Sequence, residues 1–304
     1  MTDRGSGPEL MISGWIILDK PVGIGSTPCV SAVKRALREA GAAKTKVGHG
    51  GTLDPLASGV LPIALGEATK LAGRMLDASK SYDFTIKFGA QTDTLDLEGV
   101  VIATSDARPT MAEIDAILDR FRGPVDQVPP AYSALKVDGK RAYDLARAGE
   151  AVELKARSVT VYSLMLHASD ENSATISATV SKGPYIRSLA RDIALALGTV
   201  GHVTMLRRTR AGPFDLAQSI SLDKLAELAK GRALDGAVLP LIAGLDDIPA
   251  LPVTPEEASL LRHGQRLTRT LATPGLVLAT DAGRPVALVE AGTDGLRVIR
   301  GFNI

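Results

Sequence analysis

The sequence predicts a protein of mixed helices and strands that ends in a small β module, and three observations support this. Segments that alternate apolar and polar residues, such as residues 82–89, are typical of strands. Apolar residues at helical spacing behind capping patterns, as after Thr110, indicate helices. Near residues 248–252 the chain becomes linker-like, and short alternating segments follow. We therefore expect two parts, residues 1–248 and residues 249–304.

The composition is that of an ordinary globular protein. The chain has 304 residues, 45% hydrophobic and 23% charged, which is enough for a large domain plus a small one. Cys29 is the single cysteine, so the chain can form no internal disulfide and no cysteine-based zinc site. The first residues lack the apolar core of a signal peptide, and no apolar run is long enough to span a bilayer. We expect a soluble, cytoplasmic protein.

The net charge of +1 predicts no partner, but two stretches are locally basic. One covers residues 34–46, and the other covers residues 182–210. The second stretch sets one acid, Asp192, against a group of basic residues, namely Lys182, Arg187, Arg191, Arg207, Arg208 and Arg210. Such patches on a neutral protein suit a polyanion bound at one face. Solvated helix faces explain the same charges equally well.

The N-terminal half opens with a predicted strand, loop and helix. Residues 14–20 form an unbroken apolar run that predicts a buried strand. Thr27 suits an N-cap and Pro28 the first helical position of the helix that follows. The loop before Thr27 lacks the P-loop string and GxGxxG, so it carries no nucleotide signature. Residues 46–70 are punctuated by glycine and proline, which argues against one regular element over that length.

Further elements are predicted along the chain by their spacing. In residues 82–89, Tyr82, Phe84, Ile86 and Phe88 should face one side of a strand. Residues 159–168 and 174–181 predict paired strands, SKGP precedes a helix that ends at Gly198, and another helix should follow Ser221. Two capping boxes are predicted, Thr110 with Glu113 and Thr254 with Glu257.

Asp54 is the first candidate for chemistry. It precedes a proline in the glycine-rich string GHGGTLDPLASGVLP, where proline favours extended backbone and glycine allows a ligand to approach closely. An isolated carboxylate in such a loop suits a nucleophile or a base. A plain Asp-Pro turn is the structural alternative. His49 lies five positions earlier, and no string such as HExxH marks it as a metal ligand.

Two further segments carry polar side chains that could act in a site. The acids Asp93, Asp96 and Glu98 could bind a metal, but their spacing matches no calcium loop, so a polar turn is the better interpretation. The string KGPYIR places Tyr185 and Arg187 at a helix start, where free N–H groups favour an anion. Arg187 could pair with a carboxylate and hold it ionised. The alternative is a surface cation beside a packed tyrosine.

Several segments together resemble the bacterial tRNA pseudouridine synthase B family. They occur in the family's order and cover most of residues 14–214, namely GWIILDKPVGIGS, VGHGGTLDPLASGVLPIALGEATK, KSYDFTIKFGAQTDTLDLEG, QVPPAYSALKVDGKRAYDLAR, SKGPYIRSLARDIALALG and GHVTMLRRTRAGPF. The resemblance implies an α+β fold, with a mixed, mainly antiparallel central sheet and flanking helices, known as the pseudouridine synthase fold. It also implies that residues 249–304 form an RNA-binding module of the PUA type.

The resemblance implies roles for individual residues. Asp54 matches the catalytic aspartate, and Arg187 matches the arginine that pairs with it. Tyr82 matches the tyrosine that stacks on the target base, and His49 matches a histidine at the flipped nucleotide.

Four more positions match residues around the family's active site. Tyr185 and Leu206 match pocket residues that contact the substrate, and Lys20 with Pro21 matches a pair that supports the active-site loop. No metal ligand is implied. The chain departs from the family pattern at two positions where threonine is usual or frequent, Gly50 and Pro184.

The reaction implied by the resemblance is the isomerisation of uridine at position 55 in the TΨC loop of tRNA. Uracil leaves C1′, rotates and rejoins through C5, so no redox cofactor, nucleotide or metal is required. Flipping the base out costs on the order of a few kcal/mol, and stacking on Tyr82 could offset roughly 1–3 kcal/mol. The basic stretches would hold the RNA backbone in a salt-sensitive way. The expected partner is the TΨC stem-loop of tRNA, with no membrane, no obligatory protein partner and a monomeric state.

Two other classes of function stay open from the residues alone. A non-catalytic RNA-binding or RNA-folding protein would account for the basic stretches and the C-terminal module without needing Asp54. Assistance in tRNA folding could also accompany catalysis. A glycosidase would combine Asp54 with a second carboxylate. No second acid lies near Asp54 in the sequence, so this class requires one that the fold brings in.

Overall fold

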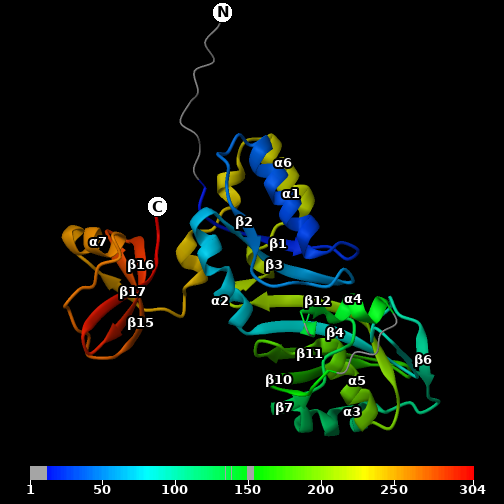
Figure 1. The fold of residues 1–304 in the computed structure, drawn as a ribbon. Coiled ribbons are helices and arrows are strands. Elements are labelled where there is room, and N and C mark those ends of the chain that lie inside the picture. The colour runs from blue at the N-terminus through cyan, green and yellow to red at the C-terminus, as the bar shows by residue number, and fades with distance from the viewer. Residues whose placement is uncertain (1–11, 134, 138, 149–153) are drawn as a thin grey trace, which may run out of the picture.

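The structure is a computed structural model that describes residues 12–133, 135–137, 139–148 and 154–304. Within these residues a nine-stranded sheet has the order β1-β3-β12-β4-β11-β10-β7, with β2 also on β3 and β13 on β12 (Figure 1). Its strands are β1 (Gly14–Lys20), β2 (Val47–His49), β3 (Ala57–Leu65), β4 (Lys80–Phe88), β7 (Gly123–Gln127), β10 (Arg157–Ser169), β11 (Ser173–Val180), β12 (Gly201–Ala211) and β13 (Phe214–Asp215). Strands β3 and β12 run parallel and the other pairs run antiparallel, which confirms the expected mixed, mainly antiparallel sheet.

Smaller sheets and the helices complete the fold. Two hairpins pair β5 (Ala90–Thr92) with β6 (Val101–Thr104) and β8 (Lys136–Val137) with β9 (Lys140–Arg141). The C-terminal sheet has the order β14 (Ala250–Pro252), β15 (Gly275–Asp281), β16 (Arg284–Gly292) and β17 (Gly295–Gly301). The α-helices are α1 (Ser26–Glu39), α2 (Ala72–Asp77), α3 (Met111–Leu118), α4 (Ala142–Arg147), α5 (Ile186–Ala196), α6 (Leu222–Lys230) and α7 (Pro255–Arg262). Short 3-10 helices are Gly66–Leu71, Asp119–Phe121, Leu216–Gln218, Leu234–Ala237 and Leu241–Gly244.

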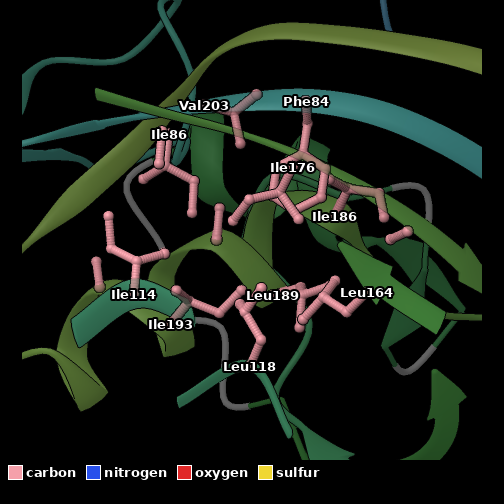
Figure 2. Close-up of a cluster of buried hydrophobic side chains, with 14 of the residues drawn as sticks. Phe84, Ile86, Ile114, Leu118, Leu164, Ile176, Ile186, Leu189, Ile193 and Val203 are labelled. Carbon is pink, nitrogen blue, oxygen red and sulfur yellow. The ribbon is translucent and has the colours of Figure 1, made fainter. Parts of the chain in front are cut away.

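Helices α3 and α5 cover one face of the large sheet (Figure 1). Figure 2 shows Leu189 and Ile193 of α5 directed toward Phe84 and Ile86 of β4 within one hydrophobic core. The alternation in residues 82–89 therefore places large apolar side chains against the helix, as predicted. Full burial of each such side chain stabilises the fold by about 1.5–3 kcal/mol. This packing fixes the N-terminus of α5 relative to β4.

Strand β1 is buried on both faces, which explains its unbroken apolar run. Its alternate side chains join two clusters, one with α1 and α6 and one on the opposite face of the sheet. Tyr82 of β4 and Leu206 of β12 pack against both the α5 core and the α1 core. These two residues therefore lie where the two halves of the large sheet meet.

The C-terminal sheet packs onto the large sheet. Leu278, Leu288 and Phe302 share one buried cluster with Trp15 of β1. Lys70 Nζ donates to Gly301 O of β17 at 2.9 Å. Because both parts share this cluster, the predicted division after residue 248 stays a prediction. Within the described residues, no helix has the length and apolar character needed to cross a bilayer.

Most predicted elements are confirmed, and the start of α1 differs. Both capping boxes are present, as are the paired strands β10 and β11 and helix α6 after Ser221. Helix α1 begins at Ser26 with Gly25 as its N-cap, so the prediction of Thr27 as N-cap is wrong. The hydroxyl of Ser26 bonds the backbone of Leu53, and this contact with a distant loop draws the helix start forward.

Candidate active site

A cavity of about 1070 Å³ opens between the start of α1, the loop after β2 and the turn after β5. Its lining includes Asp54, His49 and Arg187 among the predicted site residues, together with Asp96 and Tyr132. The volume lies at the upper end of the range for sites that hold small ligands. Both acidic and basic groups therefore face a space that can admit a nucleotide.

Asp54 lies in the loop between β2 and β3, with a side chain that is 41% exposed. The residue before it is clamped, because Leu53 N–H donates to Ser26 Oγ at 2.8 Å and Ser26 Oγ donates to Leu53 O at 3.1 Å. The Asp54 carbonyl accepts from Ala57 N–H at 3.1 Å. The carboxylate is thus accessible on a fixed backbone, which is the arrangement a reacting group requires.

Arg187 pairs with Asp54 from the first turn of α5. Its Nη2 lies 2.8 Å from Asp54 Oδ2, and its Nη1 lies 3.4 Å from Asp96 Oδ2. The same two nitrogens donate to the carbonyls of Thr94 at 2.8 Å and Tyr132 at 3.0 Å. The Arg187 side chain is only 7% exposed, so these charges interact in a poorly hydrated setting. The ion pair therefore places a buried cation directly against one oxygen of the Asp54 carboxylate.

The sequence places Asp96 in a polar turn and does not predict its contact with Arg187, which the fold creates. Its Oδ1 accepts from Thr94 Oγ1 at 2.6 Å and from Glu98 N–H at 3.0 Å. Leu95 takes a left-handed conformation with φ of 63°, which an L-residue adopts only at some cost in energy. The segment is the polar turn that the sequence predicts. It additionally holds a second carboxylate against the arginine.

Lys20 supports the Asp54 loop from below. Its side chain is fully buried, and Nζ donates to the carbonyls of Ile24 at 2.6 Å, Pro21 at 3.0 Å and Pro55 at 3.3 Å. Burial lowers the pKa of Lys20, while the charge of Asp54 acts in the opposite direction. The Lys-Pro pair therefore ties the loop after β1 to the residue that follows Asp54.

His49 ends β2 and lines the cavity as a half-buried side chain. Its Nδ1 accepts a long hydrogen bond from Gly51 N–H at 3.4 Å. Burial lowers the pKa of His49, and the charge of Arg208 lowers it further. The imidazole is accordingly neutral at neutral pH and can act as a hydrogen-bonding group toward a ligand.

The remaining predicted residues are only partly gathered at the site. Leu206 and Asp54 share a narrow pocket of about 20 Å³, which has room for about one water molecule. Tyr82 and Tyr185 line neither this pocket nor the large cavity. Tyr185 is the N-cap of α5, and its N–H donates to Gln127 Oε1 at 2.7 Å. The structure brings together Asp54, His49, Arg187 and Leu206, with Lys20 beneath the loop.

Models of protein families match the chain along most of its length. The N-terminal domain of the TruB family pseudouridylate synthases matches residues 34–186. The tRNA pseudouridylate synthase B C-terminal domain matches residues 187–246, and the C-terminal domain of tRNA pseudouridine synthase II matches residues 248–303. The chain belongs to the TruB family. The C-terminal β module is accordingly of the PUA type.

Relatives of this TruB family chain carry a consistent name. A tRNA pseudouridine synthase B from Novosphingobium aromaticivorans is 61% identical over 299 residues, covering 97% of this chain and 98% of the relative. One from Zymomonas mobilis is 57% identical over 296 residues, with 97% and 98% covered. This TruB family chain is therefore a pseudouridine synthase that acts on tRNA.

Solved structures agree with the TruB family fold. An H/ACA RNP bound to a substrate RNA containing 2′-deoxyuridine aligns with a TM-score of 0.74 and 25% identity, covering 96% of this chain and 85% of that one. A Cbf5-Nop10-Gar1 complex aligns with a TM-score of 0.72 and 27% identity, covering 95% and 84%. The expected pseudouridine synthase fold is confirmed.

The departure from the TruB family pattern at Gly50 has a physical counterpart. A Cβ atom added at Gly50 would lie 2.7 Å from Met75 Cβ and 3.0 Å from Met75 Cγ. A larger residue at this position therefore requires Met75 of α2 to move. Pro184 is half-buried and directly precedes the N-cap of α5.

The basic stretch of residues 182–210 is not a uniform RNA-facing surface. Arg187, which lines the cavity, and Arg208, which does not, are both buried, at 6% and 1% exposure. Arg207 pairs with Asp19 at 2.8 Å. The charge count did not separate these buried cations from surface ones, because both kinds look alike in a sequence.

Proposed function

We propose that this enzyme converts the uridine at position 55 of the TΨC loop of tRNA into pseudouridine, with Asp54 as the catalytic carboxylate. The observation that carries the proposal is the 2.8 Å ion pair between Arg187 Nη2 and Asp54 Oδ2 beside a cavity of about 1070 Å³. An accessible, charge-paired carboxylate is the group that attack at the sugar or the base needs. The enzyme acts without an obligatory protein partner and as a monomer.

The proposed reaction balances within the nucleoside itself. The C1′–N1 bond breaks, uracil rotates, and a C1′–C5 bond forms; C5 then loses its proton and N1 gains one. Asp54 can serve this sequence by attack at C1′, by attack at C6, or by removing a proton from C2′. In each case Arg187 balances the carboxylate charge while the bonds to the sugar change.

The proposal places the target uridine outside the tRNA loop, flipped toward Asp54. Neutral His49 lines the cavity that would receive the nucleotide. The pocket beside Leu206 holds about 20 Å³, so a base bound there requires neighbouring side chains to move. We propose that this movement also brings the base into contact with Tyr82 and Tyr185, which do not line the cavity.

Asp96, the carboxylate that the fold brings to Arg187, does not favour a glycosidase function. Asp96 accepts from Thr94 and Glu98 through one oxygen and faces Arg187 with the other, and its side chain is 9% exposed. These contacts give Asp96 a supporting position, so it offers no free base to activate water.

The test is to map pseudouridine in an unmodified tRNA transcript incubated with the pure protein, without added cofactor or metal. We expect pseudouridine at position 55 and no release of free uracil. Product at a different position would overturn the assigned site, and release of uracil would favour the glycosidase.

We further propose that residues 249–304 bind RNA and that the protein assists tRNA folding, because flipping a loop base requires the RNA to open. The variant Asp54→Asn separates this role from catalysis. It should restore misfolded tRNA to an aminoacylatable form as well as the native protein does. Loss of this rescue in a variant that still binds tRNA would contradict the folding role.

A further inference from the structure

We propose that Arg208 is a positioning residue for the isomerisation, because it holds the loop that carries Asp54 through the backbone carbonyls of Gly51 and Thr52. This inference rests on the proposed role of Asp54. Arg208 lies on β12, where its Cα partners are Tyr82 on β4 and Gly59 on β3. Arg208 therefore lies on the strand between β3, which follows the Asp54 loop, and β4, which carries Tyr82.

The guanidinium of Arg208 reaches across β3 to the loop. Its Nε donates to Val60 O at 2.7 Å, Nη1 donates to Thr52 O at 3.2 Å, and Nη2 donates to Gly51 O at 3.2 Å. Three separate nitrogens thus engage three carbonyls, which only a planar fork can do. Together with the Ser26 clamp on Leu53, these bonds hold three consecutive residues of the loop, Gly51 to Leu53.

Arg208 differs from Arg187 in what balances its charge. Arg187 pairs with two carboxylates, whereas within the described residues Arg208 has carbonyl acceptors and no carboxylate partner. At 1% exposure it also lacks solvent. A buried cation without a counter-ion is costly, and an apolar residue would be expected there if packing alone were served. The geometry points to a requirement for this cation at the loop.

The position of Arg208 itself is narrowly set. A Cβ atom added at Gly59 would lie 2.1 Å from the backbone oxygen of Arg208, so β3 and β12 approach more closely than a side chain allows. Gly59 also has φ of 104°, which favours glycine. The two strands are therefore locked together at the residue from which the guanidinium extends.

The charge of Arg208 also affects titratable side chains at and beside the site. It lowers the pKa of His49, which lines the cavity, and that of Lys20, which supports the same loop. Replacing Arg208 with an uncharged residue should therefore raise the pKa of His49. If Arg208 only filled space, its replacement would leave the pKa of His49 unchanged.

The test compares Arg208→Met, Arg208→Lys and the control Arg122→Met, an arginine that also donates to a backbone carbonyl, Leu164 O at 2.7 Å. The measurements are the single-turnover rate at saturating enzyme, the Kd for tRNA and the His49 ring titration by NMR. We expect Arg208→Met to lower the rate about 100-fold, since a displacement of about 1 Å has effects of that size. The Kd should stay within about threefold.

The same comparison gives clear opposing outcomes. The His49 pKa should rise in Arg208→Met and stay unchanged in Arg208→Lys, which keeps the charge. If Arg208→Met does not fold, Arg208→Lys decides. A single Nζ cannot occupy the three separate positions from which the guanidinium nitrogens bond Gly51 O, Thr52 O and Val60 O, so the rate should fall about tenfold or more. A native rate in folded Arg208→Lys or Arg208→Met would overturn the inference. An inactive native protein would instead overturn the proposed function.

Discussion

The loop of residues 50–56 and the turn of residues 92–100 both present a carboxylate to Arg187, but they are held in different ways. The loop is anchored from outside by Lys20, Ser26 and Arg208, which bond to its backbone. The turn also has outside contacts, from Arg187 to Thr94 O and from Val203 N–H to Leu95 O. Its carboxylate, however, is held by the turn itself, since Asp96 accepts from Thr94 and from the N–H of Glu98. Asp54 is 41% exposed and Asp96 is 9% exposed.

This difference agrees with the proposed roles of Asp54 as the reacting carboxylate and Asp96 as a supporting one. A carboxylate whose oxygens accept local hydrogen bonds is held firmly, but it has few acceptor positions left for a substrate. A carboxylate whose backbone is fixed by remote groups keeps its oxygens for chemistry. Arg187 joins the two, so its replacement should affect both regions, while replacements within each region should differ.

Among replacements that leave Asp54 in place, replacing the shared cation Arg187 should have the largest effect. Arg187→Lys keeps the charge but loses the planar fork that reaches both carboxylates. We expect the single-turnover rate to fall on the order of 10³-fold, as when a preorganised donor is removed from an active site. A rate within tenfold of the native value would show that the two regions act independently.

A buried cation bound only to carbonyls should make stability depend on pH. Lys80 donates to Leu76 O and Ala78 O, and burial lowers its pKa from 10.5 to about 8. Between pH 8 and pH 10.5 the unfolded chain binds more protons, so the free energy of unfolding should rise with pH. Relative to Lys80→Met, we expect a rise of about 3 kcal/mol over this window.

Urea unfolding of the native protein and Lys80→Met at several pH values measures this difference. The gain should appear as the pH rises through 8 and should be complete near 10.5. Parallel curves for the two proteins would mean that Lys80 has an ordinary pKa in the folded state.

Changing the supporting carboxylate should have a smaller effect on the rate. Asp96→Asn keeps an oxygen for Thr94 and Glu98 but removes one charge from Arg187. Losing a charge-assisted contact of about 2 kcal/mol should slow the single-turnover rate roughly 30-fold. If Asp96→Asn were as inactive as a replacement of Asp54, the division between reacting and supporting carboxylate would fail.

Loosening one external anchor should have the smallest effect. Ser26→Ala removes both hydrogen bonds to Leu53, at a cost of about 1 kcal/mol and a roughly fivefold lower rate. Ser31→Ala is a matched control on the same helix, because its hydroxyl donates only to Thr27 O on the exposed side. Equal rates for the two variants would indicate that the clamp does not position the loop.

The sequence predicted those parts of the site that lie within continuous strings. Asp54 and Arg187 stand in motifs whose residue types suggest their chemistry, and the 2.8 Å contact between them agrees with that expectation. Asp96 was interpreted as part of a polar turn because the sequence does not show that Arg187 packs against it.

Single strands and helices could be predicted from local periodicity. The pairing of strands that are distant in the sequence could not. Alternation located β4, β10 and β11, and capping patterns located α3 and α7. Arg208 was grouped with surface cations because burial between β3 and β4 follows from the parallel pairing of β12 with β3. Crossing connections of this kind leave no periodic signal in the strands they join.

The central claim is that Asp54 carries out the chemistry and that the rest of the site positions it. The most direct measurement is the single-turnover rate of Asp54→Asn on tRNA, beside its Kd for the same tRNA. We predict a rate lowered by on the order of 10⁴-fold or more, with a Kd within about threefold of the native value. Pseudouridine formed by Asp54→Asn at the native rate would contradict the account.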